Sequence, residues 1–254
     1  MKGVILVGGL GTRLMPMTRI TNKHLLPVGG FPMVYYPLYN LVEAGVRDIM
    51  IVTGGNSPGD FLELLHDGSE FGLDHLSFVY QRGAGGIADA LRLTRNFVGD
   101  ERVVVMLGDN ILGGSIGPFV EAYRDQPSGA KVLLKSVPDA ERFGVAEVAE
   151  DGRVLSIVEK PDEPASDLAV VGVYMFDETV WGIVAGLKPS ARGQLEITDV
   201  NNAYLERGDL TADVLDCEWS DAGTIESLAR AAEITRASAF WQSADLPSGQ
   251  GESL

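Results

Sequence analysis

A glycine-rich segment containing an arginine follows a short apolar run near the amino terminus. It reads Gly8-Gly9-Leu10-Gly11-Thr12-Arg13-Leu14, and Lys23 follows ten residues after the arginine. Backbone N–H groups of a glycine turn can approach a polyphosphate closely, and arginine and lysine both pair with phosphate oxygens. The segment therefore predicts a nucleotide-binding loop in which Gly8, Gly9, Gly11 and Thr12 contact the nucleotide and Arg13 and Lys23 supply positive charge. An ordinary surface loop with solvated cations is the alternative.

The loop follows neither of two common nucleotide-binding patterns. A dinucleotide fingerprint requires a glycine where Leu14 stands, and a P-loop requires Gly-Lys-Ser or Gly-Lys-Thr instead of Gly11-Thr12-Arg13. In addition, no acidic residue ends a second strand about 20 positions later, as a nicotinamide site needs. A nicotinamide-dependent dehydrogenase is therefore disfavoured.

Two aspartates stand where a magnesium ligand would be useful. Asp109 follows a strongly apolar run and a glycine, so we expect it at the carboxyl end of a parallel strand, where open α/β sheets bind ligands. Asp221 follows a shorter predicted strand. Mg²⁺ takes one or two carboxylates together with phosphate and water oxygens. Taken singly, each aspartate would more often cap a loop.

The remaining reactive residue types form no catalytic or metal-binding pattern. His24, His66 and His75 lack the spacing of metal ligands, and no Ser-His-Asp or Cys-His set supports covalent catalysis. Cys217 is the single cysteine and is expected to be a small buried hydrophobic residue. By itself, the pair Glu159-Lys160 is typical of a solvated sheet edge.

The elements that must position these residues alternate between short apolar runs and helical patterns, which is typical of a mostly parallel sheet. In the first half we predict strands over 4–7, 48–53, 76–80 and 102–107, and helices over 32–44, 60–66 and 86–98. In the second half we predict strands over 131–137, 145–148, 154–158 and 168–176, and helices over 197–207 and 224–241. Asp151-Gly152 is a two-residue hairpin signal, and Thr224 is a plausible helix cap. One domain over residues 1–242 and a disordered tail over 243–254 are expected.

Composition narrows the class of protein further. Of the 254 residues, 45% are hydrophobic and 22% are charged, as in packed globular proteins. The net charge of −16 argues against binding to nucleic acid or to anionic lipid. The first apolar run is too short for a signal peptide, and no stretch approaches the roughly 20 apolar residues of a membrane span. We expect a cytoplasmic protein without nucleic-acid or membrane partners.

Several motifs in one order resemble the sugar-1-phosphate nucleotidyltransferases, and among them the glucose-1-phosphate thymidylyltransferases. Besides the glycine loop they are Lys-x-Leu-Leu-Pro-Val at 23–28, Pro-Met-x-Tyr-Tyr-Pro-Leu at 32–38, Leu-Gly-Asp-Asn at 107–110, Glu-Lys-Pro at 159–161, Pro-Ser-Ala-Arg-Gly-Gln-Leu-Glu-Ile-Thr-Asp at 189–199 and Trp-Ser-Asp-Ala-Gly-Thr at 219–224. The resemblance implies a Rossmann-like, three-layer α/β fold with a mostly parallel mixed central sheet.

The resemblance also implies a role for particular residues. Asp109 and Asp221 would hold the catalytic Mg²⁺, and Lys160 would bind the sugar phosphate and act with Arg13 and Lys23 in catalysis. Three further residues would line the sugar-phosphate side of the site, namely Gly144, Glu159 (which would bind the sugar hydroxyls) and Arg192.

The part of the family pattern that reads the base is only partly kept. Gln81 matches a glutamine whose amide meets a pyrimidine edge, and Gly86 matches a glycine of the same loop. Between them, Arg82-Gly83-Ala84-Gly85 replaces a proline-containing stretch, and Asp89 stands where glutamine or histidine is usual. A thymidine or uridine triphosphate is favoured because Gln81 can donate and accept, but the altered loop leaves nucleotide selectivity open.

The expected reaction joins a nucleoside triphosphate, dTTP being favoured, to a sugar 1-phosphate, glucose 1-phosphate being favoured, and releases pyrophosphate. Alternatives are transfer of another nucleotide, a modified sugar, cyclitol or phosphonate as acceptor, or a non-catalytic nucleotide-sensing subunit. A homo-oligomer, dimer or tetramer, is expected. Because the tail lacks the helical segments that build an inter-subunit product site in the family, product inhibition is expected to be simply competitive.

Overall fold

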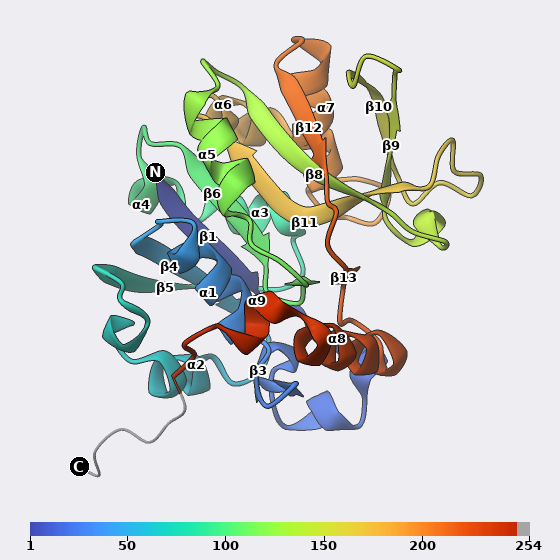
Figure 1. The fold of residues 1–254 in the computed structure, drawn as a ribbon. Helices are drawn as coiled ribbons and strands as arrows, with labels where there is room; N and C mark the ends of the chain where they lie inside the picture. Colours follow the sequence, from blue (N-terminus) through green and yellow to red (C-terminus); the bar gives the residue numbers. More distant parts are fainter. Residues whose placement is uncertain (248–254) are drawn as a thin grey trace.

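One mixed sheet runs through both halves of the chain in the computed structural model, which describes residues 1–247 (Figure 1). Its strands lie in the order β10-β9-β11-β6-β1-β4-β5, and β8 pairs with both β11 and β12. The strands are β1 (Lys2–Val7), β4 (Asp48–Gly54), β5 (His75–Gln81), β6 (Val103–Leu107), β8 (Ala130–Ser136), β9 (Gly144–Val148), β10 (Val154–Glu159), β11 (Leu168–Phe176) and β12 (Leu210–Val214). Two short pairs lie outside it, β2 (Pro27–Val28) with β3 (Phe31–Pro32) and β7 (Ile111–Leu112) with β13 (Trp219–Ser220).

The first half of the sheet is parallel, as the alternating pattern predicts. β1 lies between β4 and β6 and pairs with both in parallel, and β4 pairs in parallel with β5. The direction changes at β11, which is antiparallel to β6, β8 and β9. Because parallel strands end at the same edge, the segments that follow β1, β5 and β6 gather there.

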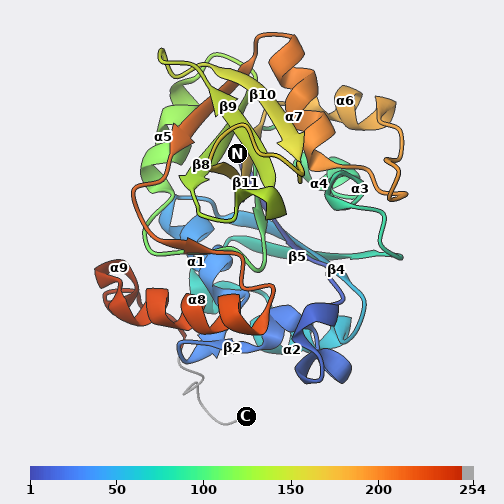
Figure 2. The ribbon, with the colours of Figure 1, turned by 90° about the vertical axis from the view of Figure 1, so that its right-hand side faces the viewer.

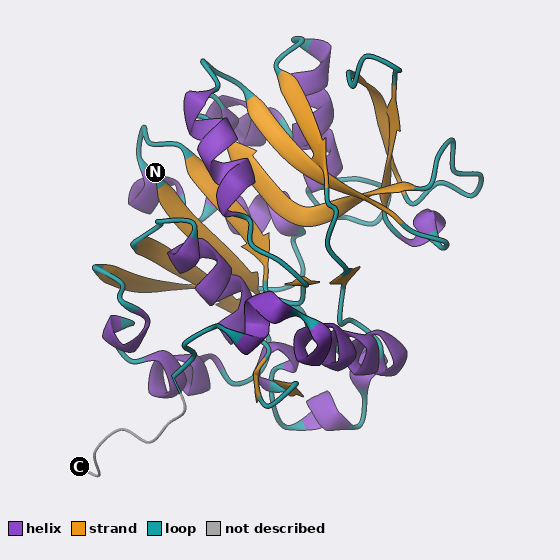
Figure 3. Cartoon of the chain, viewed as in Figure 1, coloured by secondary structure: helices purple, strands orange, loops and turns teal. Residues whose placement is uncertain are grey.

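Helices cover both faces of the sheet and make three layers (Figures 2 and 3). One face packs against α1 (Tyr35–Glu43), α2 (Pro58–Leu65), α5 (Gly117–Asp125), α8 (Ile225–Ala237) and α9 (Ala239–Gln242). The other face packs against α3 (Ile87–Arg92), α4 (Arg95–Val98), α6 (Val180–Gly186) and α7 (Ile197–Glu206). The sheet is buried from both sides, so its central strands are apolar runs rather than alternating patterns.

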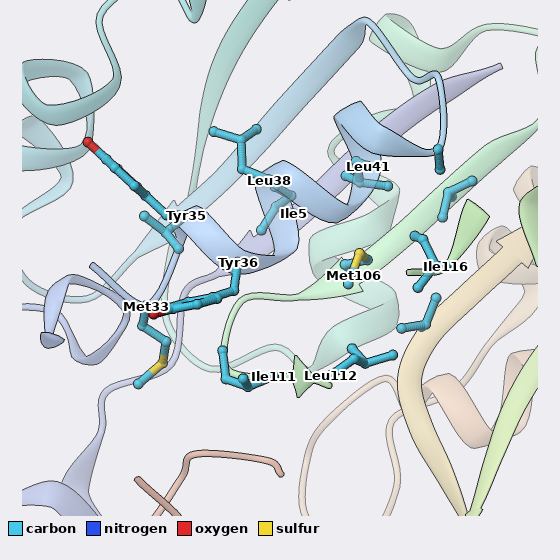
Figure 4. Packing of buried hydrophobic residues seen from close by; sticks show 14 of the residues in the cluster. Ile5, Met33, Tyr35, Tyr36, Leu38, Leu41, Met106, Ile111, Leu112 and Ile116 are labelled. Atoms are coloured by element: carbon cyan, nitrogen blue, oxygen red, sulfur yellow. The ribbon is translucent and has the colours of Figure 1, made fainter. Parts of the chain in front are cut away.

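The apolar side chains of α1 pack against the central strands of the sheet. Leu38 and Leu41 of α1 and Ile5 of β1 are fully buried together with Met106 of β6 (Figure 4). Burying each such side chain contributes about 1.5–3 kcal/mol relative to exposure. This packing holds β1 and β6, the two strands that lead into the site.

Most predicted strands and helices are confirmed within one to three residues, but two long helices are each divided. The helix expected over 86–98 breaks near Thr94, whose hydroxyl donates to the Leu91 carbonyl at 2.8 Å. The helix expected over 224–241 breaks at Ser238, whose hydroxyl donates to the Gly113 carbonyl and caps α9. At Thr94 the side-chain hydrogen bond is local, whereas at Ser238 it joins the end of the helix to a segment far away in the sequence. The Thr224 cap is confirmed, as a capping box with Ser227.

Three further differences concern the second half. The hairpin of β9 and β10 is confirmed, but its connection runs over residues 149–153, so the two-residue turn predicted from Asp151-Gly152 is wrong. No helix was predicted over α5 or α6, and no strand over β12. Leu246, inside the expected tail, is buried and packs with the core, while residues 248–254 lie outside the described part of the chain.

Candidate active site

Two adjoining cavities of about 420 Å³ each open at the edge where β1, β5 and β6 end. We call them the glycine-loop cavity, which the segment after β1 lines, and the hairpin cavity, which β9 and β10 line. Every site residue predicted from the sequence lines at least one. Gly8, Gly9, Gly11, Thr12, Lys23, Gln81, Gly86 and Arg192 line the glycine-loop cavity, Arg13, Gly144 and Asp221 line the hairpin cavity, and Asp109, Glu159 and Lys160 line both.

Asn22 anchors the glycine loop to the sheet. Its buried side-chain amide donates to the carbonyls of Val7 at 3.0 Å and Gly54 at 3.3 Å, which end β1 and β4. Gly11 has a φ of +63°, and a Cβ there would lie 2.7 Å from Thr18. Only glycine meets both demands at low cost, so this turn depends on it. The loop is thereby held against the strand ends with Lys23 beside it.

Lys23 and Asp109 form an ion pair at the boundary of the two cavities. The second carboxylate oxygen of Asp109 accepts from the Asn110 amide at 3.1 Å. Burial raises the pKa of the Asp109 carboxyl, but the Lys23 charge and these hydrogen bonds outweigh it and hold the pKa below its ordinary value. Asp109 is therefore ionised at neutral pH. Burial and Lys23 also lower the pKa of the adjacent His24 to about 3, so this ring is neutral.

Asp221 reaches the same cavity because β13 pairs with β7, which follows Asp109 closely in the chain. Its carboxylate lies 3.5 Å from the Arg142 guanidinium. A Cβ at Gly223 would lie 2.8 Å from Arg13 Nη2 and 3.3 Å from Asp221 Oδ2, so the arginine and the aspartate face each other across this glycine. Arg142 was not predicted as a site residue, although it stands only two residues before Gly144 in the segment Arg142-Phe143-Gly144-Val145.

The two aspartates fit a magnesium site by their chemistry. Each is a carboxylate in the hairpin cavity, and each is balanced by a cation, Lys23 or Arg142. Within residues 1–247 no group of three or more histidine, cysteine, aspartate or glutamate side chains is arranged to hold a metal. A cation here would therefore need phosphate or water oxygens besides Asp109 and Asp221, which is how Mg²⁺ is usually bound.

On the hairpin side, Glu159 is held by two neighbours. It accepts from the Thr198 hydroxyl at 2.7 Å and from the Arg192 guanidinium at 3.2 Å, and Arg192 also lies 2.9 Å from Glu196. Lys160 adopts a φ of +46°, which is strained for a residue with a side chain and is most frequent at functional sites. The register places Gly144 opposite Glu159, and a Cβ on this glycine would lie 3.5 Å from both Glu159 Oε2 and Thr198 Oγ1.

Three buried polar residues of the hairpin cavity, Tyr174, Asn201 and Asn110, were not predicted as site residues. Tyr174 of β11 is 4% exposed, and Asn201 of α7 is 1% exposed with no hydrogen-bond partner for either side-chain atom within the described residues. A signal for Asn201 was present, because it stands one helical turn after Ile197 and Thr198, on the same face of α7. Asn110 was also missed as an organiser, since its Oδ1 accepts from Gly172 N and Trp219 Nε1, both at 2.8 Å.

Comparison with known proteins agrees with this arrangement. Residues 2–238 match the model of the nucleotidyl transferase family, and the chain belongs to that family. It is 45% identical over 239 residues to a glucose-1-phosphate thymidylyltransferase of Neisseria meningitidis, covering 93% of this chain and 83% of the relative. For the same enzyme of an Actinoplanes species, the identity is 44% over 240 residues, covering 93% of this chain and 78% of the relative.

A solved structure is also similar over nearly the whole described fold. It is a Bacillus anthracis protein assigned as a glucose-1-phosphate thymidylyltransferase, in complex with sucrose, and the TM-score is 0.89 at 51% identity. The match covers 93% of this chain and 95% of that one. The three-layer fold and the family expected from the motifs are confirmed. Among the helices of residues 1–247, none is both long enough and apolar enough to span a bilayer.

Proposed function

We propose that this protein is a sugar-1-phosphate nucleotidyltransferase that joins a nucleoside triphosphate, dTTP being favoured, to glucose 1-phosphate. The products are an NDP-sugar and pyrophosphate. The observation that carries the proposal is that the glycine-loop and hairpin cavities share Asp109, Glu159 and Lys160. A triphosphate in the first cavity and a sugar phosphate in the second would meet at these residues. The names of the two relatives support the choice of substrates.

The chemistry is an in-line displacement at the α-phosphorus. A phosphate oxygen of the sugar 1-phosphate attacks the α-phosphorus, the bond from this phosphorus to the β-phosphate oxygen breaks, and the electron pair leaves with pyrophosphate. The attacking oxygen is already ionised, so no general base is needed. The protein contributes positioning and charge stabilisation, which is the main source of catalysis in phosphoryl-type transfers.

The charged residues divide this task between them. Lys23, in the glycine-loop cavity, and Arg13, which extends from the glycine loop into the hairpin cavity, would neutralise the triphosphate and the leaving pyrophosphate. Lys160 and Arg192 would hold the incoming phosphate, and Glu159 would accept hydrogen bonds from sugar hydroxyls. Asp109 and Asp221 would hold Mg²⁺, which when bound neutralises charge on the triphosphate and supports its in-line geometry.

The cation pairs explain how the site avoids uncompensated charge before its substrates bind. Lys23 and Arg142 lie against Asp109 and Asp221, the same carboxylates that would hold the metal. A metal with its triphosphate would supply cation and anion together, so Lys23 and Arg142 can then turn to phosphate oxygens without leaving either carboxylate unpaired. The charges are balanced both in the free site and in the site with metal and triphosphate bound. This lowers the free-energy cost of replacing the ion pairs by the substrate contacts.

Pyrophosphate release over a matrix of nucleoside triphosphates and sugar 1-phosphates, with Mg²⁺, tests the proposal. We expect the highest kcat/KM with dTTP and glucose 1-phosphate, and at least tenfold lower values with purine triphosphates. Higher turnover with a modified sugar, a cyclitol or a phosphonate would correct the acceptor and keep the reaction class. No pyrophosphate from any pair would contradict the enzymatic function and favour a nucleotide-sensing role.

The proposal also includes the oligomeric state and the cellular location of the protein. A homo-oligomer acting in the cytoplasm is the expected state, and light scattering coupled to size-exclusion chromatography would measure the number of subunits directly.

A further inference from the structure

Gln81, at the end of β5, lines the glycine-loop cavity, and its side-chain amide nitrogen donates two hydrogen bonds within the protein. The side chain is 7% exposed, and its Nε2 donates to the Gly86 carbonyl at 3.1 Å and to Asp89 Oδ2 at 2.9 Å. A carbonyl and an ionised carboxylate can only accept hydrogen bonds. The nitrogen of the amide must therefore face these two partners, and the oxygen must face the other way.

The oxygen of Gln81 is directed to the loop side of the cavity and has no donor there. A Cβ placed on Gly8 would lie 3.2 Å from Gln81 Oε1, so this oxygen lies against the glycine loop. Among residues 1–247, no N–H or O–H group donates to it. An acceptor inside a nucleotide cavity requires a donor from the ligand, because leaving it unpaired costs binding free energy.

Asp89 is itself held in place, outside the cavity. Its Oδ1 accepts from the Arg92 guanidinium at 2.6 Å, one turn further along α3, and its side chain is 17% exposed. A Cβ on Gly85 would collide with Asp89 Oδ2, closer than real side chains ever approach. Asp89 can therefore occupy this position only because residue 85 is a glycine. The altered loop and the altered residue at position 89 form one structural unit.

On the basis of the proposed function, we propose that Asp89 is the positioning residue that decides which pyrimidine is accepted. It holds the Gln81 amide with the oxygen toward the base. Thymine and uracil carry an N3–H that can donate to this oxygen, whereas N3 of cytosine is an acceptor and would face it unpaired. Asp89 acts only through Gln81 and does not touch the nucleotide.

The substitution Asp89→Asn inverts this arrangement. The oxygen of the introduced amide would remain with Arg92, because the guanidinium can only donate, and the amide nitrogen would then face Gln81. The Gln81 amide would turn its oxygen to this donor and its nitrogen to the base, and it would give up the hydrogen bond from its nitrogen to the Gly86 carbonyl. We expect the dTTP-to-dCTP ratio of kcat/KM, and the matching ratio of binding constants from calorimetry with Mg²⁺, to fall at least tenfold in D89N.

Two further variants separate positioning from a general structural effect. Arg92→Gln keeps the contact between Asp89 and Gln81, so its dTTP-to-dCTP ratio should stay within twofold of the parent protein. Gly85→Ala should lower the ratio as D89N does, because the added methyl displaces the Asp89 carboxylate. In a Gly85→Ala, Asp89→Ala double variant, the ratio should equal that of Asp89→Ala alone.

The outcomes distinguish this inference from the proposed function. If the parent protein releases pyrophosphate but D89N keeps the parental dTTP-to-dCTP ratio, the role of Asp89 is wrong and the reaction stands. If the parent protein releases none, the reaction is wrong, and the calorimetric ratio still decides whether Asp89 sets the preference. A loss of affinity for both nucleotides by the same factor would also overturn the inference, because it indicates only structural support.

Discussion

At the scale of single residues, charge placement distinguishes this site from an ordinary polar cleft. Asp109 and Asp221 lie in one cavity, each beside a cation, although 86 and 79 residues separate the respective partners along the chain. This is the feature that makes the two aspartates candidates for a metal rather than for a loop cap.

Asp109→Asn and Asp221→Asn are each expected to lower kcat/KM at least 100-fold in the pyrophosphate assay, because each removes charge that would hold the metal. Both residues stand at strand ends outside the core, so both variants should fold, but Asp109→Asn should lower the midpoint of urea unfolding because it leaves Lys23 without its charge partner. Asp151→Asn, in the exposed turn after β9, provides the matched control and should keep parental turnover. Near-parental turnover of either site variant with Mg²⁺ present would rule out the two-aspartate site.

At the scale of elements, helix α7 determines how the hairpin presents Glu159. Thr198, in the first turn of α7, donates to Glu159, and Asn202 donates to the Ile157 carbonyl of β10 at 3.0 Å. The helix therefore fixes both the backbone of the strand and the carboxylate at its end. The part of the site that would bind the sugar depends on this contact between one helix and one strand.

Thr198→Val keeps the shape of the side chain but removes the hydroxyl that orients Glu159. A hydrogen bond to a charged group contributes about 1.5–3 kcal/mol, so KM for glucose 1-phosphate should rise about tenfold or more. KM for dTTP should stay within twofold, because the glycine loop is untouched. Thr211→Val on β12, which lines neither cavity, is the control. Equal changes in both KM values would show that α7 supports the whole site instead.

At the scale of the whole molecule, Asp177 connects the second half of the sheet to two helices. Its carboxylate, 4% exposed, accepts from Gly129 N, from the Thr179 backbone and hydroxyl, and from the Tyr204 hydroxyl. Burial raises the pKa of Asp177, but these hydrogen bonds outweigh it and hold the pKa below its ordinary value. One ionised side chain thus joins the end of β11, the approach to β8, the start of α6 and helix α7.

Asp177→Asn should lower the free energy of unfolding by about 1–3 kcal/mol at pH 7, since an amide cannot satisfy the same donors. The folded-state pKa lies below the unfolded value of 3.8, so the stabilisation is complete above pH 3.8 and is lost as the pH falls through the folded-state pKa. The difference in urea midpoint between parent and variant should therefore be largest at pH 7 and shrink below pH 3.8. A difference that does not depend on pH would contradict the ionic role.

The sequence by itself determined the features of this protein that depend on residues close together along the chain. The apolar runs bounded by glycine predict the parallel strands, because burial on both faces selects such runs. The glycine loop and the motifs around Asp109, Lys160 and Asp221 predict the family and the residues that line the cavities. Local patterns were less reliable where a side chain competes with the backbone, as Thr94 and Ser238 do when they divide two helices.

Only the tertiary structure decided which of these residues meet. The pairing of Arg142 with Asp221, the burial of Asn201 in the hairpin cavity, and the contact between Gln81 and Asp89 all join separate elements. No local pattern encodes them, because hydrogen bonds and ion pairs of this kind depend on strand order, register and helix placement. The orientation of the Gln81 amide is the clearest case, since the sequence offers both a donor and an acceptor and the fold leaves one of them toward the cavity.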